Sequence, residues 1–455
     1  MRELTLAQIA DWCDGALLQG VPSATVNAIS TDSRKGGPDD LFVALKGDRF
    51  DAHHFLGDVV QRGVGAILVS SLPVESERYA GGIIRVKDTL RALQCFARQH
   101  RKSSTDLRVI GITGSNGKTS TKDFLSAVLA KGGSVNCTAG NLNNHIGLPM
   151  TILAGDERDR FGVWEMGMNH AGEIEVLAEI ANPDAAVITN IGTAHIEYMG
   201  TREAIAAEKS ALATALPKGG YCVMPVTDEF YESVKEQVSA EMIPVGIGQG
   251  EVRAESLTAD SDGRMRFSLC SAYGATVSVA LPVRGEHMVM NALLAAAVGF
   301  REGILAEEIA AALSNCVLTH GRLEEKLIRG ISVLDDTYNA NPDSMAAALA
   351  TLQASQTTGR RVAVLGFMGE LGEHAEAEHL RLGALVSSRQ IDALVTVGEK
   401  AAKINHRAAG LAVNEHFPTH QEAADFLQNY LVEGDLVLVK GSRSAAMEQV
   451  IAGIN

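Results

Sequence analysis

The pattern of apolar and polar positions alternates between short strand-like runs and longer helix-like runs over most of the chain. Residues 107–113 form an apolar run typical of a buried strand, and residues 119–131 repeat apolar side chains at the spacing of one helix face. The alternation continues to about residue 226 and begins again after residue 321. Because parallel sheets covered by helices produce this pattern, we predict an α/β fold with two such domains.

Two regions depart from that pattern. Residues 251–281 alternate polar and apolar positions between turn formers, which predicts a small antiparallel element. The first hundred residues contain shorter strand-like runs and a helix from residue 89 to about residue 100, and we interpret the polar segment 101–105 as a linker. The predicted domains are therefore residues 1–103, 104–316 and 317–455.

Composition narrows the class of protein. The 455 residues are 46% hydrophobic, which suffices for several cores and excludes a disordered chain. The 55 acidic and 40 basic residues give a net charge of −15, which argues against a general nucleic-acid-binding surface. Six cysteines without a C-x-x-C pair favour a reducing compartment, so we expect a cytoplasmic protein, and we expect a monomer. The weakly polar stretch 287–300 is shorter than the roughly 20 residues of a membrane span and predicts a buried helix.

A glycine-rich segment joins the strand-like run at 107–113 to the following helix. It matches a short form of the phosphate-binding loop, Gly-x-x-Gly-Lys-Thr, although Ile112 breaks the longer standard spacing. Glycines let the backbone approach a phosphate, Lys118 adds a positive charge, and Thr119 offers a hydroxyl to Mg²⁺. A glycine-rich turn that only caps the helix is the alternative. The expected nucleotide-binding residues are Gly114, Ser115, Asn116, Gly117, Lys118, Thr119 and Ser120.

Polar side chains also gather where the central strands end. Glu165 ends the strand-like run that begins at residue 161, and His195 follows the run that begins at residue 185. Because Mg²⁺ prefers oxygen ligands and strand ends commonly face bound phosphates, Glu165 is the first metal candidate. His195 is placed to reach a metal or a phosphate. The alternatives are a solvated loop carboxylate and a structural histidine.

Four motifs together resemble one family over nearly the whole chain. They are the phosphate loop 114–119, the asparagine-rich loop 140–149, residues 165–170, and the Asp-Asp-Thr-Tyr-Asn-Ala-Asn-Pro-Asp-Ser segment at 335–344. The resemblance is to the Mur ligase family, the ATP-dependent amide-forming enzymes of peptidoglycan precursor synthesis. It implies a small N-terminal UDP-sugar-binding α/β domain, a central ATPase domain with a parallel sheet, and a C-terminal Rossmann-like domain that receives the incoming amine.

The resemblance also implies a reaction. ATP would phosphorylate the C-terminal carboxylate of UDP-N-acetylmuramoyl-tripeptide, and the amine of D-alanyl-D-alanine would attack the acyl phosphate. The segments 335–344 and 140–149 favour this branch over a ligase that adds the third amino acid and over a folylpolyglutamate synthetase. A phosphate-loop ATPase that switches protein partners is the alternative from another class. Whether the third residue of the peptide is meso-diaminopimelate or lysine stays open.

Individual roles follow from the same resemblance. Lys118 would neutralise the phosphates, and Mg²⁺ would occupy two sites near Thr119, Glu165 and His195. Lys209 aligns with a lysine that the family commonly carbamylates, which would turn it into a metal ligand; without the alignment it would be interpreted as a solvated helix residue. The residues implied in catalysis or metal binding are Lys118, Thr119, Glu165, His195 and Lys209.

Substrate contacts are implied in all three domains. Asn291 matches an adenine-contacting asparagine, Arg322 an arginine that approaches ATP, and Asp336 an acid on the ribose side. His54 departs from the family's UDP-binding pattern, so its role stays open, and a helix cap is the alternative for residues 440–444. The remaining expected contacts are Ser33, Arg34 and Lys46 for the UDP-sugar, Ser442 and Arg443 for the dipeptide carboxylate, and Asn141, Asn144, Tyr338, Asn339 and Asn341.

Overall fold

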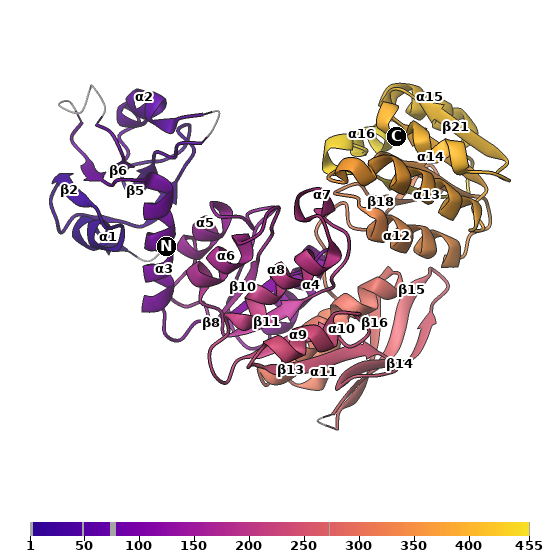
Figure 1. Cartoon of the computed structure of the whole chain (residues 1–455), viewed down its shortest axis with the longest axis horizontal. Helices are drawn as coiled ribbons and strands as arrows, with labels where there is room; N and C mark the ends of the chain where they lie inside the picture. The colour runs from indigo at the N-terminus through magenta and orange to yellow at the C-terminus, as the bar shows by residue number, and fades with distance from the viewer. Residues whose placement is uncertain (1–2, 48–49, 73–78, 273, 455) are drawn as a thin grey trace.

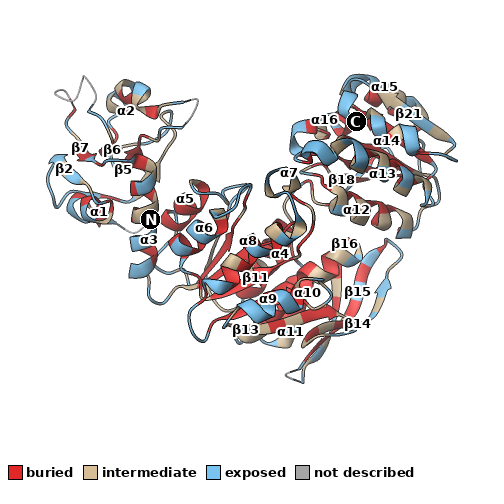
Figure 2. Cartoon of the chain, viewed as in Figure 1, coloured by how far each residue is buried: buried red, intermediate tan, exposed pale blue. Residues whose placement is uncertain are grey.

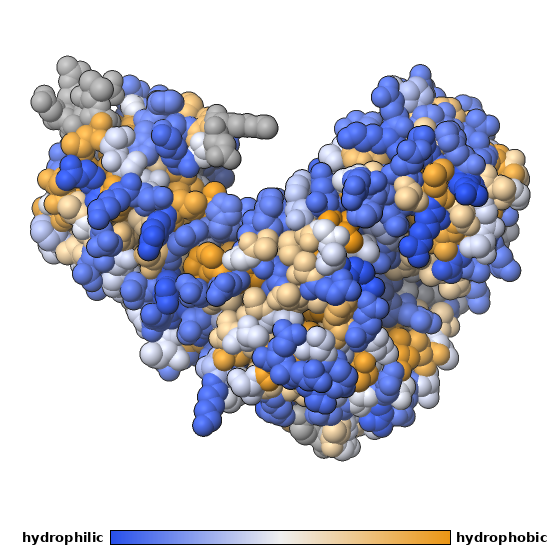
Figure 3. Space-filling model, in the orientation of Figure 1, coloured by the Kyte–Doolittle hydropathy of each residue, from blue (hydrophilic) through white to orange (hydrophobic). Residues whose placement is uncertain are grey.

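The computed structural model describes residues 3–47, 50–72, 79–272 and 274–454. These residues fold into three α/β lobes that follow one another along the chain (Figure 1). The first and third lobes stand on either side of the central one, and the surface is hollowed between them (Figure 3). The fold-class prediction is confirmed, whereas the exact domain boundaries stay predictions.

The first lobe is built around a sheet with strand order β2-β7-β6-β5-β4. Strands β4 to β7 pair in parallel, and β2 is antiparallel to β7. A separate pair, β1 (Leu4–Thr5) with β3 (Thr25–Val26), lies beside it. The sheet strands are β2 (Ala16–Gln19), β4 (Ala28–Ser30), β5 (Asp40–Val43), β6 (Ala66–Val69) and β7 (Gly82–Arg85), and the helices are α1 (Leu6–Trp12), η1 (Ala52–Phe55), α2 (Leu56–Gln61) and α3 (Thr89–Ser103).

Helix α3 connects the first lobe to the central one, and here the sequence interpretation is wrong. The segment 101–105 was expected to be a linker, but α3 runs to Ser103 and Arg101 is only 5% exposed. The Arg101 guanidinium donates to the carbonyl of Ala181 at 3.1 Å and pairs with Asp184 at 3.0 Å. The polar segment at 101–103 is therefore the end of a helix that packs against the central lobe, which fixes the connection between the two lobes.

The central lobe contains one long sheet with order β16-β15-β14-β13-β12-β11-β8-β10-β9. Pairing is parallel from β9 to β14 and antiparallel from β14 to β16, so the antiparallel element is confirmed and continues the same sheet. The strands are β8 (Arg108–Thr113), β9 (Val135–Cys137), β10 (Phe161–Glu165), β11 (Ala185–Ile188), β12 (Tyr221–Pro225), β13 (Glu241–Ile247), β14 (Val252–Ala259), β15 (Arg264–Ser271) and β16 (Thr276–Arg284).

Helices cover both faces of this sheet and bury it (Figure 2). The expected buried helix is α10 (Glu286–Arg301), which packs with α4 in one of the two cores. No helix within the described residues is long and apolar enough to cross a bilayer. The other helices are α4 (Lys118–Leu129), α5 (Gly147–Leu153), α6 (Glu173–Ala181), α7 (Ile196–Met199), α8 (Arg202–Thr214), α9 (Tyr231–Gln237) and α11 (Ala306–Ser314).

The third lobe has a sheet with order β17-β18-β22-β19-β20-β21, parallel except for the β17 edge. Its helix α12 begins at Pro342 and is capped by Asn341, whose side chain accepts a hydrogen bond from the Ser344 amide. The strands are β17 (Glu324–Ile328), β18 (Ile331–Asp336), β19 (Arg361–Leu365), β20 (Ala393–Val397), β21 (Val413–Phe417) and β22 (Leu436–Lys440). The helices are α12 (Pro342–Ala354), η3 (Gly372–His374), α13 (Ala375–Ser387), η4 (Glu399–Ala401), α14 (Ala402–Arg407), α15 (His420–Tyr430), η5 (Arg443–Ala445) and α16 (Glu448–Gly453).

Candidate active site

A pocket of about 1310 Å³ lies where the central and third lobes meet. The carboxyl ends of β8, β10 and β11 face it from the central lobe, and those of β18 and β22 face it from the third. Crevices outside the carboxyl ends of parallel strands are where α/β proteins usually bind ligands. We therefore expect the predicted site residues to line this pocket.

The phosphate loop has a backbone that only glycine permits at two positions. At Gly114 φ is 148°, and an added Cβ would lie 1.8 Å from Thr189 Oγ1. At Gly117 φ is 80°, and a Cβ would lie 2.4 Å from Asn291 Oδ1. The loop is further fixed by Asn190, whose side chain accepts from the Asn116 amide at 2.8 Å. Its glycines and the contact with Asn190 thus fix the shape of the loop.

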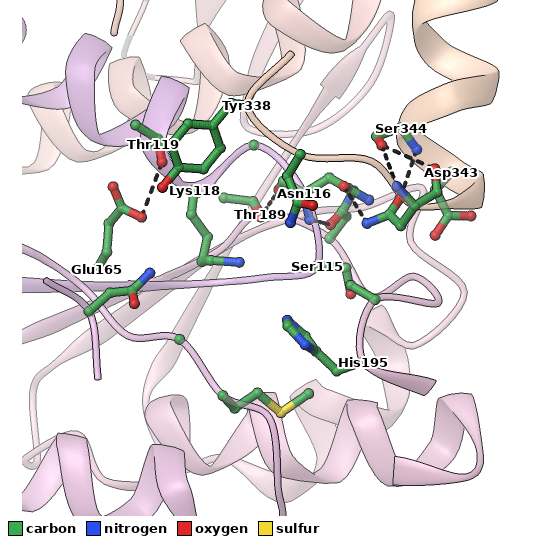
Figure 4. Close-up of a pocket in the computed structure, with 18 of the residues that line it drawn as sticks. Ser115, Asn116, Lys118, Thr119, Glu165, Thr189, His195, Tyr338, Asp343 and Ser344 are labelled. Atoms are coloured by element: carbon green, nitrogen blue, oxygen red, sulfur yellow. Dashed lines mark hydrogen bonds between the residues drawn. The ribbon is translucent and has the colours of Figure 1, made fainter. Parts of the chain in front are cut away.

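Lys118, Thr119 and Glu165 lie together at the start of α4, as predicted (Figure 4). Lys118 Nζ donates to the Gly114 carbonyl at 2.6 Å, and desolvation lowers its pKa to about 8 against the opposing charge of Glu165. Glu165 is 1% exposed, and its Oε2 accepts from Thr119 Oγ1 at 3.3 Å. Burial raises the pKa of Glu165, and within the described chain its Oε1 has no hydrogen-bond partner. The site therefore holds a buried carboxylate oxygen that lacks a partner.

His195 and Lys209 occupy different positions around this centre. His195 lines the pocket, and its Nδ1 lies 2.7 Å from Glu370 Oε2 of the third lobe. Both residues adopt the left-handed backbone region, with φ of 65° and 59°. Lys209, on α8, is 1% exposed and is not among the described residues that line the pocket. Burial, with the charge of Lys118, holds the pKa of Lys209 well below its usual range.

The expected nucleotide contacts beyond the loop also line the pocket. Arg322 donates to Thr119 Oγ1 at 3.2 Å, and its guanidinium lies 4.0 Å from the centre of the Tyr338 ring. Asn291 is buried beside Gly117. Asp336 pairs with Lys440 Nζ at 2.6 Å. The structure thus brings all of these residues together from two lobes.

The expected substrate residues divide into those in the pocket and those outside it. The side-chain oxygen of Asn144 accepts hydrogen bonds from the amides of Ile146 and Gly147 at the start of α5, and Asn144 also borders the pocket. The pocket lining includes Asn141, Asn144, Tyr338, Asn339, Asn341 and Arg443. The described lining leaves out Ser442, which is buried, and the first-lobe residues Ser33, Arg34 and Lys46.

In the first lobe, the UDP-sugar candidates lie on an exposed surface. The Arg34 side chain is 84% exposed and pairs with Asp32 at 2.9 Å. Lys46 is 71% exposed, with its Nζ 3.9 Å from Asp51 Oδ2. These groups are available to a ligand from solvent, and they do not share the pocket with the phosphate loop within the described chain.

Sequence reasoning missed several polar residues of the pocket. Lys440 is 2% exposed, and its Nζ also donates to the Asn339 carbonyl at 2.9 Å. Burial lowers the pKa of His287 to about 4, despite the nearby Asp336. Glu370 follows β19 and Asp343 opens α12. Lys440 and Asp343 stand inside motifs that the sequence displays, whereas nothing in the sequence pattern connects Glu370 with His195.

Comparison with known proteins gives the family. The Mur ligase middle domain matches residues 112–299, and the Mur ligase, glutamate ligase domain matches residues 321–443. The chain is 38% identical to the UDP-N-acetylmuramoyl-tripeptide--D-alanyl-D-alanine ligase of Bacillus subtilis, over 99% of this chain and 98% of that protein. The chain belongs to the Mur ligase family. The ligase of the same name from Escherichia coli (strain K12) is 36% identical over 100% of this chain and 99% of its own length.

Solved Mur ligase structures show the same architecture. The structure of MurF from Acinetobacter baumannii has a TM-score of 0.93 and 33% identity, and the match covers 100% of this chain and 99% of that one. The MurF ligase of Thermotoga maritima, solved in complex with ADP, has a TM-score of 0.85 and 27% identity, with 94% and 97% coverage. The three-lobed arrangement of this Mur ligase is therefore that of the family.

Proposed function

We propose that this Mur ligase uses ATP to join D-alanyl-D-alanine to UDP-N-acetylmuramoyl-tripeptide. The products are ADP, phosphate and the UDP-N-acetylmuramoyl-pentapeptide precursor of peptidoglycan. The observation that carries the proposal is the match to ligases of this name over almost the full length of both chains. The pocket supports it, because a phosphate loop and the third lobe enclose one space.

The proposed chemistry begins with activation of a carboxylate. The terminal carboxylate of the tripeptide attacks the γ-phosphorus of ATP, and ADP leaves. The amine of the dipeptide then attacks the carbonyl carbon of the acyl phosphate, a proton leaves the nitrogen, and phosphate departs. Lys118, whose Nζ donates to the Gly114 carbonyl, and Arg322, which donates to Thr119 Oγ1 from the third lobe, are the cations that would stabilise charge along the phosphates.

The residues present fit a Mg²⁺ ion beside the phosphates. The Thr119 hydroxyl, which donates to Glu165 Oε2, and Glu165 Oε1, which has no partner within the described residues, are hard ligands, and His195 borders the same space. The described residues contain no cluster of three acidic, histidine or cysteine side chains placed to hold a metal. Substrate phosphates and water would therefore complete the coordination, and the bound ion would supply positive charge to the transferring phosphoryl group.

Lys209 fits carbamylation because its amine is buried and depressed in pKa. A neutral amine adds to CO₂ and releases a proton, which gives a carbamate anion. That anion would face the cationic side of the pocket, near the charge of Lys118. We place it as a further oxygen ligand for the second metal ion.

The substrates are proposed to span the lobes. Ser33, Arg34 and Lys46 would hold the UDP-sugar on the first lobe, and the peptide would cross the hollow surface to the pocket (Figure 3). Asn291 would contact adenine and Asp336 the ribose. The dipeptide would lie against the third lobe, with its carboxylate at Arg443. The other proposed peptide contacts are Asn141, Asn144, Tyr338, Asn339, Asn341 and Ser442. The proposed domains are residues 1–103, 104–316 and 317–455, and we place the enzyme in the cytoplasm as a monomer.

The test is ligation with a panel of acceptors. Purified enzyme is given ATP, Mg²⁺ and UDP-N-acetylmuramoyl-tripeptide with D-alanyl-D-alanine, meso-diaminopimelate, D-glutamate or no amine. We expect phosphate release and a matching product mass only with D-alanyl-D-alanine. Product with another amine would assign a sister ligase, and phosphate release without any amine would indicate an ATPase.

A further inference from the structure

The segment 189–195, which we call the bridge loop, contacts the phosphate loop along one side. The Ser115 amide donates to the Asn190 carbonyl at 3.0 Å, and the Asn116 amide donates to the Asn190 side chain at 2.8 Å. In the opposite direction, the Gly192 amide donates to Ser115 Oγ at 2.9 Å. The position of the bridge loop is therefore tied to that of the phosphate loop.

The other side of the bridge loop contacts the third lobe at two carboxylates: Glu370, which lies beside His195, and Asp343. Asp343, in the first turn of α12, accepts hydrogen bonds at its Oδ2 from the Thr193 amide at 2.7 Å and from Thr193 Oγ1 at 2.9 Å. A second contact lies beside it, because Asn341 Nδ2 donates to Asn116 Oδ1 at 2.8 Å. Figure 4 shows Asp343 and Ser344 at the start of α12, on the side where the phosphate-loop residues Ser115 and Asn116 lie. The start of α12 thus reaches both loops of the central lobe.

The contact is also close in space. A Cβ placed on Gly192 would lie 2.2 Å from Asp343 Oδ2 and 3.1 Å from Asp343 Cγ, while Ser115 Cβ is at 3.4 Å. Gly192 has no positive φ, so its backbone suits other residues. A glycine at position 192 therefore leaves the space that the Asp343 carboxylate occupies.

We propose that Asp343 is a positioning residue that latches the third lobe onto the bridge loop. The carboxylate holds the acceptor-binding lobe where the phosphate loop and His195 face it, so the dipeptide amine arrives over the activated carboxylate. The kinetic part of this inference rests on the proposed function. The latch itself concerns only how two lobes of this chain are held together.

The first experiment compares Asp343→Ala, Asp343→Asn and Gly192→Ala. The alanine at 343 removes both hydrogen bonds, the asparagine keeps an oxygen acceptor, and the alanine at 192 pushes the carboxylate away without changing α12. Glu376→Ala is the matched control, because it removes an exposed acid from the first turn of α13, away from the pocket. Thermal unfolding of each variant shows that it is folded.

We expect Asp343→Ala and Gly192→Ala to raise the KM for D-alanyl-D-alanine about tenfold, the effect of losing two hydrogen bonds of ordinary strength. Asp343→Asn should recover most of that loss. Small-angle X-ray scattering with saturating ADP should show a more extended molecule for the two alanine variants than for the wild type. Glu376→Ala should match the wild type in both measurements.

The latch is wrong if Asp343→Ala scatters like the wild type and keeps its dipeptide KM within about twofold. Equal losses in the alanine and asparagine variants at 343 would also overturn it, because the asparagine retains the acceptor. If the wild type forms no product with the dipeptide but the alanine variants still open the molecule, the proposed function fails and the latch stands.

Discussion

At the residue scale, burial sets the properties of the charged groups around the pocket. Desolvation lowers the pKa of Lys118 and of Lys209 and raises that of Glu165. The sequence predicted that Lys118, Thr119 and Glu165 meet, because a loop motif and a strand end specify their places. It did not predict the contact of His195 with Glu370, since two loops of different lobes create it.

Lys118→Ala is the prediction that belongs to the residue scale, and we expect it to remove most of the activity. The variant removes the cation at the phosphate loop, and we expect the rate of phosphate release to fall by a factor on the order of 10² to 10³. Steady-state phosphate release with both peptide substrates measures the effect. Lys118→Arg keeps the charge on a broader group and should retain more activity. Turnover near the wild-type rate in Lys118→Ala would refute the assignment of the loop.

Lys209→Ala tests the carbamate. Loss of a buried anionic ligand should inactivate the enzyme, and short carboxylic acids added to the assay should restore part of the activity, because they supply the missing carboxylate. The shorter alanine side chain on α8 leaves room for these acids. The readout is the acid-dependent rate of the variant compared with that of Lys118→Ala, which carboxylic acids should not rescue. An unaffected Lys209→Ala enzyme would end the carbamate assignment.

At the scale of elements, most central strands and helices follow from the hydrophobic pattern, because their periodicity is regular. The strand expected at 107–113 is observed as β8 (Arg108–Thr113), and the helix expected at 119–131 is observed as α4 (Lys118–Leu129). The pattern failed at the end of α3, where Arg101 is polar yet buried. Its partners are carbonyls and a carboxylate from the end of α6 and the following turn, and a local pattern carries no information about them.

Arg101→Ala should therefore destabilise the protein. The variant leaves Asp184 without its closest cation and two carbonyls without a donor, and we expect a loss of about 2 kcal/mol in the free energy of unfolding. Urea unfolding measures it. Arg98→Ala, one turn earlier on α3, removes an exposed pair with Glu179 and should cost less than about 0.5 kcal/mol. Equal losses of unfolding free energy in the two variants would contradict the conclusion that Arg101 fixes α3 to the central lobe.

At the scale of the whole molecule, the candidate active site is assembled from two lobes. The phosphate loop and the bridge loop belong to the central lobe, while Arg322, Asp336 and Asp343 approach from the third. The sequence predicted three units because the pattern restarts twice. It did not predict which loops touch across the lobes, since that depends on how folded bodies pack rather than on periodicity.

The central claim is that ATP activates the tripeptide carboxylate as an acyl phosphate. The most direct measurement uses UDP-N-acetylmuramoyl-tripeptide labelled with ¹⁸O in its terminal carboxylate, with ATP, Mg²⁺ and D-alanyl-D-alanine. Because the bridging oxygen stays with phosphorus when the amine attacks carbon, the account predicts that each released phosphate carries one ¹⁸O from the carboxylate. Product formation with unlabelled phosphate would contradict the account.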